Sequence, residues 1–297
     1  MNNAYSKILV SGKNGQLGKE LQDLVSANAN HEFIFFDRQE LNIADEAAFA
    51  NIFQKHKPSF FINCAAYTAV DKAETDQENA YIINAEAVGN IAKQCAAYKT
   101  KLIHVSTDYV FDGTANEPYK EDDATNPINY YGYTKWLGEQ LALNNNPDSI
   151  IIRTSWVYSE FGNNFVKTML RLMNERAAIN VVNDQFGSPT YAKDLAEAIM
   201  KIVNSEQLAV TRLTLTAHHS PVYHFSNDGI ISWYDFAVTI RDIKKLNCII
   251  NPIPTSSYPT PAKRPAYSGL DKTKIVNTFN IQLKSWKESL NKCLQQL

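Results

Sequence analysis

The sequence has little cysteine, little histidine and almost no net charge. Its 297 residues include four cysteines, which lie far apart and form no Cys-x-x-Cys pair: Cys64, Cys95, Cys248 and Cys293. This spacing excludes a disulfide framework and a zinc site of the usual kind, and it favours a reducing compartment, the cytoplasm. The formal net charge of −2 provides no global basic field, so we expect no nucleic-acid partner.

Long apolar runs and histidine clusters are also scarce. No run approaches the roughly 20 residues of a membrane-spanning helix, and the polar start at residues 1–6 lacks the apolar region of a signal peptide. We therefore expect no membrane partner. The six histidines are scattered apart from His218, His219 and His224, which occupy a polar stretch that favours a solvated loop over a metal site.

Short apolar segments alternate with amphipathic ones through the first half of the chain. Strands are predicted at residues 7–11, 31–37, 59–64, 101–106 and 149–153, and helices at 16–26, 45–55, 76–98 and 131–143. This alternation is typical of an α/β fold, a Rossmann-type doubly wound parallel sheet with helices on both faces. The apolar run 33–36 lacks polar alternation, which predicts a strand buried on both sides.

The alternation weakens after about residue 154. Helices are predicted at 165–175, 192–204 and 233–245, a strand at 222–227, a proline-rich loop at 251–265 and one helix in the last thirty residues. We therefore predict a dinucleotide-binding domain over residues 1–155 and a smaller C-terminal α/β substrate-binding lobe over 156–297. Some segments of the second part are expected to return to the first.

A glycine-rich turn directly follows the first predicted strand. In the run GKNGQLG, residues 12–18, the glycines stand three positions apart and the next helix begins within the run. Glycine permits a tight turn, and it lets backbone amides at a helix N-terminus approach a pyrophosphate. The position of the turn favours a dinucleotide cofactor over a plain loop.

Opposite charges end the second predicted strand. Asp37 stands about twenty residues beyond the glycine turn, where an acid would bind ribose hydroxyls. Arg38 would instead favour the 2′-phosphate of the phosphorylated cofactor. The two residues leave the choice between NADPH and NADH open. The third strand ends in the small side chains of residues 63–68, which leave room for a ligand at the edge of the sheet.

Tyr131 and Lys135 stand four positions apart in a predicted helix and therefore share one of its faces. An ammonium beside a phenol would favour the phenolate and lower the tyrosine pKa from its usual ~10. Thr107, at the carboxyl end of the fourth strand, would hold a substrate oxygen against that phenol. The spacing alone is common, but the neighbouring Tyr130 and Tyr133 have no lysine four positions on.

Longer segments resemble the extended short-chain dehydrogenase/reductase superfamily: GKNGQLG, NCAAYTAVDKAE, STDYVFDG, YYGYTK and RTSWVY. Within it, the chain is similar to the dTDP-4-dehydrorhamnose reductase family through GNNFVKTML, NDQFGSPTY, YHFSNDG and PTPAKRPAYSGLD. The resemblance implies reduction of the 4-keto group of dTDP-6-deoxy-L-lyxo-4-hexulose to dTDP-L-rhamnose with NADPH or NADH, in nucleotide-sugar and cell-surface polysaccharide biosynthesis. A homodimer is compatible with it.

The resemblance also implies roles for individual residues. The catalytic group would be Thr107, Tyr131 and Lys135. The dinucleotide would be lined by Gly15, Gln16, Leu17, Asp37, Ala66, Tyr67 and Thr68, with Asn42 and Ile43 near the adenine, and the turn and strand-end patterns add Gly12, Asn14, Arg38 and Ala65. Tyr131 and Lys135 would also contact the cofactor, with Lys135 at the nicotinamide ribose. The sugar nucleotide would meet Asp108 and Trp156.

Two cations near the C-terminus and one glutamate complete the expectations. Lys263 and Arg264 would pair with the diphosphate of the substrate, although their loop is equally compatible with plain solvation. Some family members bind Mg²⁺ at a dimer contact, and Glu20 matches one of their ligands. The other ligands have no evident match, so no metal site is predicted.

Three other functions share this scaffold. Nucleotide-sugar dehydratases carry an Asp-Glu pair after the fourth strand, whereas this chain has Asp108 and Tyr109, which disfavours elimination. A 4-epimerase, which recycles tightly held NAD⁺, stays an alternative. So does a non-catalytic regulatory subunit, although the complete Thr107, Tyr131 and Lys135 set argues against it.

Overall fold

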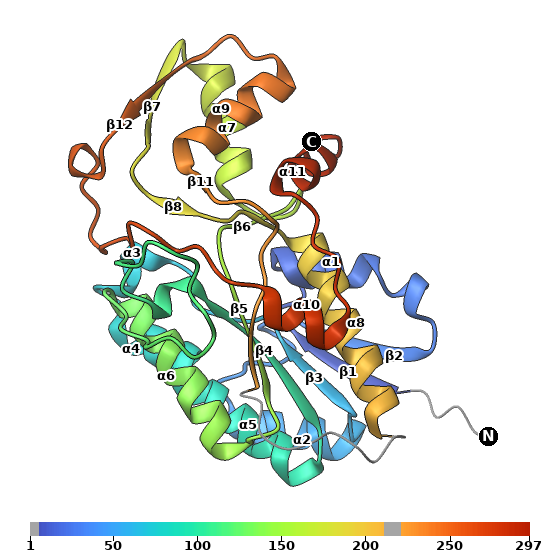
Figure 1. Cartoon of the computed structure of the whole chain (residues 1–297). Coiled ribbons are helices and arrows are strands. Elements are labelled where there is room, and N and C mark those ends of the chain that lie inside the picture. The colour runs from blue at the N-terminus through green and yellow to red at the C-terminus, as the bar shows by residue number, and fades with distance from the viewer. Residues whose placement is uncertain (1–5, 211–220) are drawn as a thin grey trace.

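A six-stranded parallel sheet lies at the centre of the protein, for which a computed structural model describes residues 6–210 and 221–297 (Figure 1). Its strands are β1 (Ser6–Ser11), β2 (His31–Phe36), β3 (Phe60–Asn63), β4 (Lys101–Thr107), β5 (Ile150–Thr154) and β10 (Val222–His224). They stand in the order β10-β5-β4-β3-β1-β2. This order reverses between β1 and β3, where a doubly wound sheet opens its ligand crevice. The predicted α/β fold is confirmed.

Alternate residues of the central strands point into two different cores. Ile8 and Val10 pack in one core, and Leu9 packs in the other. The first core is covered by α1 (Gln16–Asp23), α8 (Ala192–Val210) and α10 (Thr273–Phe279), and the second by α2 (Glu46–His56), α5 (Ala87–Tyr98) and α6 (Tyr130–Asn145) (Figure 1). Because both faces are buried, the central strands are apolar along most of their length.

The segment predicted as one helix over 76–98 is interrupted by a wider turn. It consists of α4 (Gln77–Tyr81), a π-helical turn (Ile82–Glu86) and α5, and it is preceded by the short α3 (Val70–Ala73). The π turn lies against α6. A Cβ on Gly138 of α6 would stand 2.0 Å from the carbonyl oxygen of Asn84, so only glycine allows the two backbones to approach this closely.

A third core lies beyond the carboxyl end of the sheet (Figure 1). It is formed by α7 (Phe165–Glu175), α9 (Trp233–Lys244), α11 (Trp286–Leu294) and the parallel pair of β7 (Ala178–Val182) and β12 (Ile249–Ile253). Two further strand pairs complete this region: β6 (Val157–Tyr158) with β9 (Thr190–Tyr191), and β8 (Phe186–Gly187) with β11 (Ile231–Ser232). Short 3-10 turns occupy Ser26–Asn28, Asp108–Val110 and Thr255–Ser257.

Some predictions for single elements are wrong. The strand that contains residues 33–36 is at the edge of the sheet, and Phe33, Ile34 and Phe35 are only half-buried. The proline-rich stretch 251–265 is not all loop, because β12 extends through Pro252 to Ile253. An edge strand tolerates proline, since one side of its backbone needs no partner strand.

The last thirty residues form two helices, not one. The first, α10, ends at Phe279 and is followed by Asn280, which has the left-handed φ of 50° typical of a helix C-terminus. Ser285 then caps α11 by accepting a hydrogen bond from the amide of Glu288. The expectations for residues 1–5 and for His218 and His219 lie outside the described residues.

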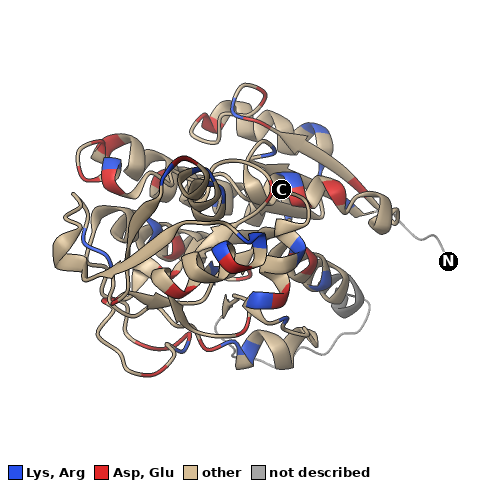
Figure 2. Ribbon diagram, turned by 90° about the horizontal axis from the view of Figure 1, so that it is seen from above, with Lys and Arg blue, Asp and Glu red and all other residues tan. Residues whose placement is uncertain are grey.

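Charged residues of both signs are interspersed along the ribbon (Figure 2). In the part of the chain that the structure describes, no helix is both long and apolar enough to cross a membrane.

Candidate active site

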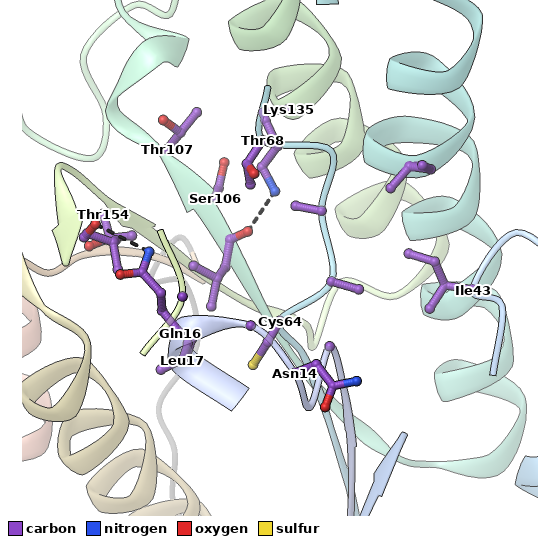
Figure 3. A pocket seen from close by; sticks show the side chains of 18 of the residues that line it. Asn14, Gln16, Leu17, Ile43, Cys64, Thr68, Ser106, Thr107, Lys135 and Thr154 are labelled. Carbon is purple, nitrogen blue, oxygen red and sulfur yellow. Dashed lines mark hydrogen bonds between the residues drawn. The ribbon is translucent and has the colours of Figure 1, made fainter. Parts of the chain in front are cut away.

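A cavity of about 770 Å³ lies at the carboxyl ends of β1, β3 and β4 (Figure 3). The predicted residues that line it are Gly12, Asn14, Gly15, Gln16, Leu17, Asp37, Arg38, Asn42, Ile43, Ala65, Ala66, Thr68, Thr107, Asp108, Tyr131, Lys135 and Trp156. Segments that are far apart in the sequence meet here because the carboxyl ends of parallel strands share one edge of the sheet.

Cys64, within the strand end 63–68 that was predicted to leave room for a ligand, also lines the cavity. Other lining residues were given no role from the sequence: Leu41, Ile83, Val105, Ser106, Thr154, Val157, Gly162, Asn163 and Leu195. Val105, Ser106 and Thr154 stand at strand ends, so the rule that located Thr107 could also have found them. Leu195 lies on α8, and only the tertiary structure brings that helix to the cavity.

The glycine turn has the shape that a pyrophosphate requires. Gly12 has a φ of +78°, and a Cβ there would lie 2.9 Å from the backbone nitrogen of Ala65. A Cβ on Gly18 would lie 2.2 Å from the carbonyl oxygen of Gly12, so helix α1 packs directly on the turn. Gly15 begins α1, and no side chain caps this N-terminus. The positive end of the helix therefore faces the cavity, which suits a dinucleotide phosphate.

Asp37 is held firmly at the far end of this half of the cavity. Its Oδ1 accepts hydrogen bonds from the amides of Gln39 (2.9 Å) and Glu40 (3.1 Å). The Nζ of Lys13 lies 3.4 Å from Asp37 Oδ2 and 2.5 Å from Glu40 Oε2. The amide of Glu40 above all, with Lys13, lowers the pKa of the Asp37 carboxyl. Asp37 is therefore ionised at neutral pH, as an acceptor for ribose hydroxyls must be.

Tyr131 is positioned by the first turn of α6. Asn129 caps this helix by accepting a hydrogen bond from the amide of Gly132 at 2.7 Å. A Cβ on Gly132 would lie 2.2 Å from the carbonyl oxygen of Tyr109, so the helix start packs against the segment that follows β4. The rings of Tyr109 and Tyr131 meet edge to face with centroids 5.7 Å apart.

The pKa of Tyr131 moves opposite to the expectation. Burial raises it to about 12, a hydrogen bond with Thr107 opposes this rise, and the charge of Asp108 adds to it. Lys135 does not lower it, because its ammonium is directed at β4: Nζ donates to the carbonyl oxygen of Val105 at 2.7 Å (Figure 3). The phenol therefore keeps its proton at neutral pH.

Lys135 is a buried cation whose charge is only partly compensated. Its side chain is 2% exposed, and its Nζ lies 3.3 Å from Nε2 of His104. Burial lowers the pKa of Lys135 to about 8, against the attraction of Glu139 one helical turn further on. Lys135 and Tyr131 share a helix face as predicted, but the lysine head group is bound to the strand.

Thr107 and Asp108 form a short hydrogen-bonded pair beside the phenol. The Oγ1 of Thr107 donates to Oδ1 of Asp108 at 2.9 Å and accepts from the amide of Tyr109 at 3.2 Å. Burial raises the pKa of Asp108 to about 6, partly opposed by the hydroxyls of Ser268 and Thr107. Near neutral pH this pair presents both a hydroxyl and a carboxylate to the cavity.

Trp156 has an unusual backbone conformation at the opposite wall. Its φ is +49°, a left-handed value that costs a bulky residue roughly 1–3 kcal/mol. Packing holds it there: its ring stacks on that of Trp233 with centroids 3.5 Å apart, and a Cβ on Gly187 would lie 2.8 Å from the Trp156 ring. Strain that is maintained by surrounding structure is typical of a ligand-binding position.

Three of the predicted residues do not line the cavity. The hydroxyl of Tyr67 donates to Asp76 at 2.9 Å. Both terminal nitrogens of Arg264 bind the carboxylate of Asp71, with Nη2 2.7 Å from Oδ2, so its charge is compensated within the fold. The side chain of Lys263 is exposed. The expectation that Lys263 and Arg264 meet the substrate diphosphate therefore has no support in the geometry.

Glu20 lies on the side of α1 that faces away from solvent, and none of it is exposed. Its Oε1 accepts a hydrogen bond from Ser159 at 2.6 Å, and burial raises the pKa of its carboxyl to about 8. Among residues 6–210 and 221–297, no group of three or more histidine, cysteine or acidic side chains could hold a metal ion.

The doubly wound sheet carries a glycine turn, and a tyrosine and a lysine lie near it on one helix face. This combination of fold and site is that of the extended short-chain dehydrogenase/reductase class. The family model described as "RmlD substrate binding domain" matches residues 6–297. A dTDP-4-dehydrorhamnose reductase from Aggregatibacter actinomycetemcomitans is 42% identical over 291 residues, which cover 96% of this chain and 97% of the relative. The chain belongs to this family, that of the dTDP-4-dehydrorhamnose reductases.

Solved structures agree with the sequence comparison. A dTDP-4-dehydrorhamnose reductase from Clostridium acetobutylicum superposes with a TM-score of 0.90 at 40% identity, covering 97% of this chain and 98% of that one. The Bacillus anthracis enzyme of the same name, in complex with NADP, gives a TM-score of 0.91 at 37% identity over 99% of this chain and 100% of that one.

Proposed function

We propose that this protein reduces the C4 ketone of dTDP-6-deoxy-L-lyxo-4-hexulose (dTDP-4-dehydrorhamnose) to give dTDP-L-rhamnose, with NADPH or NADH as reductant. One observation carries the proposal: the same cavity joins the glycine turn to Thr107, Tyr131 and Lys135. Family membership supports the proposal, because dTDP-4-dehydrorhamnose reductases match almost the whole chain and the structure of one of them contains NADP.

The two ends of the cavity suit the two partners of this reaction. A reduced nicotinamide cofactor, held by the glycine turn and by Asp37, would supply the hydride. Arg38 lines the same end and would favour the 2′-phosphate of NADPH. Asp108 is placed to accept a hydrogen bond from a sugar hydroxyl, and the ring of Trp156 offers an apolar surface to the sugar.

Tyr131 is the proposed proton donor. A phenol with a pKa of about 12 is fully protonated at neutral pH, and the alkoxide that forms at C4 is a far stronger base. Proton transfer from Tyr131 to that oxygen is therefore downhill once hydride arrives, and a general acid of this kind accelerates reactions roughly 10²–10⁴-fold. The Thr107 hydroxyl lies beside the phenol and would orient the carbonyl oxygen.

The geometry argues against dehydration. A dehydratase needs a carboxylate base after Asp108, but Tyr109 occupies that position. Burial raises the pKa of Tyr109, so its phenol stays protonated and cannot remove a proton from the sugar. Each remaining alternative makes a different prediction. An epimerase consumes no added reductant, and a regulatory subunit functions without the Tyr131 hydroxyl.

The decisive experiment mixes the purified protein with dTDP-6-deoxy-L-lyxo-4-hexulose and either NADPH or NADH. We expect loss of reduced-cofactor absorbance and a product heavier by two hydrogen atoms, as measured by mass spectrometry. Absence of oxidation with both cofactors would overturn the proposal. Interconversion of UDP-sugars without added reductant would instead identify an epimerase.

Three further expectations concern the domain division, the oligomeric state and the cellular location. The first is a division near residue 155 with some segments of the second part returning to the first domain; the pairing of β10 with β5 in the central sheet supports such a return. Limited proteolysis with mass spectrometry tests that division. A homodimer and a cytoplasmic location remain predictions, which light scattering on the purified protein and cell fractionation would test.

A further inference from the structure

A chain of buried polar groups runs behind the catalytic lysine from β1 to α6. The Oγ of Ser11 donates to Oδ1 of Asn63 at 2.7 Å, and Nδ2 of Asn63 lies 3.0 Å from Nδ1 of His104. On the other side of the imidazole, Nε2 lies 3.3 Å from Nζ of Lys135. None of the four residues is more than 2% exposed. Each polar atom in this chain must therefore find its partner within the protein.

Asn63 determines which nitrogen of His104 carries the ring proton. The Oδ1 of Asn63 also faces the amide of Ala65 at 3.3 Å, and a backbone N–H can only donate. The oxygen of the Asn63 side chain is therefore on the Ser11 and Ala65 side, and its NH₂ group faces His104. Nδ1 of the imidazole must accept, so a neutral ring has its proton on Nε2.

The Nε2–H group then points at Lys135. An ammonium has only N–H groups to offer, so its contact with Nε2–H is donor against donor. A neutral amine has a lone pair and accepts the hydrogen bond. The imidazole itself stays neutral, because burial and the charge of Lys135 hold the pKa of His104 well below its usual value. His104 therefore favours the uncharged form of Lys135.

Other charges near Lys135 act in both directions. Glu139 follows one turn later on α6 and attracts a positive charge, but Arg153 of β5 already binds its carboxylate, with Nη2 2.7 Å from Oε2. Asp108 lies just beyond the end of β4. Tyr131, on the same helix as Lys135, is uncharged at neutral pH. The attraction of Glu139 for Lys135 is thus shared with Arg153, and His104 opposes it at contact distance.

We propose that His104 is a positioning residue that holds the Lys135 amine against β4 and, through its Nε2–H group, favours the neutral form of that amine. The proposal rests on the proposed function, in which Lys135 lies in the active site. Its ammonium form would bind the hydroxyls of a cofactor ribose with its N–H groups. Loss of that form then sets the alkaline limb of the activity profile.

The direct test is ¹⁵N NMR of the full-length protein labelled at histidine. We expect His104 to show the Nε2–H tautomer and no imidazolium at pH 6. Its ring signals should shift as the pH passes about 8, the pKa to which burial lowers Lys135, and that shift should vanish in Lys135→Met. An Nδ1–H tautomer, an imidazolium at pH 6 or an unchanged shift in Lys135→Met would overturn the proposal. The NMR measurement does not depend on enzyme activity, so its outcome can be distinguished from a failure of the proposed function.

The kinetic test compares two buried histidines. The amide oxygen of Gln in His104→Gln can accept from an ammonium, so the alkaline limb of kcat/KM should move up by about one pH unit. His224→Gln is the matched control, because His224 is equally buried but contacts Arg153 and the carbonyl oxygen of Tyr119. It should leave the limb in place. An unmoved limb in folded His104→Gln, or an equal shift in both variants, would overturn the proposal.

Discussion

The two halves of the cavity are constructed differently. The cofactor half consists of short segments, each directly after a strand of the central sheet: the glycine turn after β1, Asp37 after β2, and Cys64, Ala65, Ala66 and Thr68 after β3. The substrate half depends on contacts between distant segments, such as Trp156 with Trp233 and with Gly187. The first half is local in sequence, and the second is assembled by packing.

This difference explains why sequence patterns predict the cofactor half better than the substrate half. A pyrophosphate turn needs glycine at fixed spacing, because a Cβ on Gly12 or Gly18 would strike backbone atoms. That requirement leaves a visible motif. The wall at Trp156 requires only that aromatic rings meet, and many sequences satisfy this. Local patterns therefore carry less information about the substrate half.

The largest effect should come from the residue between the two halves. Replacing Tyr131 by Phe removes the proposed proton donor and leaves the ring in place. We expect kcat to fall roughly 10²–10⁴-fold, with cofactor affinity nearly unchanged, as measured by steady-state kinetics and calorimetric titration of NADPH. Tyr133→Phe, an exposed tyrosine on the same helix, serves as the control. Full activity of Tyr131→Phe would favour a non-catalytic role.

A single added methyl group should disrupt the cofactor half. In Gly18→Ala the new Cβ meets the carbonyl oxygen of Gly12 at 2.2 Å and Cα of Lys13 at 2.8 Å, so helix α1 must move away from the turn. Overpacking of this kind costs about 1–3 kcal/mol. We expect weaker NADPH binding and a lower Tm.

Gly15→Ala is the graded comparison for this change, because its Cβ would meet only the oxygen of Gly12, at 3.3 Å. It should weaken NADPH binding less than Gly18→Ala does. Equal binding by Gly18→Ala and the unmodified protein would contradict the view that backbone contact shapes this half.

The substrate half should respond to a residue that does not line the cavity. Trp233→Ala removes the ring on which Trp156 stacks, an interaction worth about 0.5–1.5 kcal/mol beyond burial. We expect roughly a tenfold rise in KM for the sugar nucleotide, within the range that this energy allows. The Kd for NADPH should not change.

Trp286→Ala provides the matched control for Trp233→Ala. Its ring packs on Phe236 in the same third core, with centroids 5.9 Å apart. It should lower Tm without the same rise in KM. A similar KM change in both variants would mean that the third core acts as a whole and not through Trp156.

The smallest effect concerns the ion pair between Asp71 and Arg264. The hydrogen bond from Arg264 lowers the pKa of Asp71, so the pair stabilises the fold above the unfolded-state pKa of ~3.9, and this stabilisation is lost as the pH falls through the lower folded-state pKa. The pair is partly exposed and should contribute no more than about 1 kcal/mol.

Asp71→Asn should therefore lower Tm slightly at pH 7, and the difference from the unmodified protein should shrink below pH ~4. Thermal unfolding at several pH values measures it. A difference that persists at pH 3 would assign the effect to packing and not to charge. A raised KM for the sugar nucleotide would show that Arg264 also assists the substrate half.

Much of the fold could be predicted because the sheet is covered by helices on both faces. Its strands are therefore mostly apolar, and the helices that cover it are amphipathic. The failures have specific causes. The run 33–36 reads as a buried strand, but its place at the sheet edge depends on strand order, which no local pattern encodes. The break between α10 and α11 depends on Asn280 adopting a left-handed conformation, which asparagine does only in some contexts.

The candidate site divides in the same way. Spacing alone placed Tyr131 and Lys135 on one helix face. It did not show where the ammonium points, because that depends on the carbonyl oxygen of Val105 and on His104 across the interface between α6 and β4. Arg264 was expected at the diphosphate, but a bidentate partner, Asp71, stands 193 positions away in the sequence.

The α/β class and the glycine turn are encoded locally, because they follow from hydrophobic periodicity and from the steric demands of single residues, and the family follows from the resemblance of longer motifs. The protonation states of the site depend instead on how the chain packs. Burial and neighbouring groups set those states, raising the pKa of Tyr131 to about 12 and lowering that of Lys135 to about 8. Burial is a property of the packed chain, since it depends on which distant segments exclude water from each group.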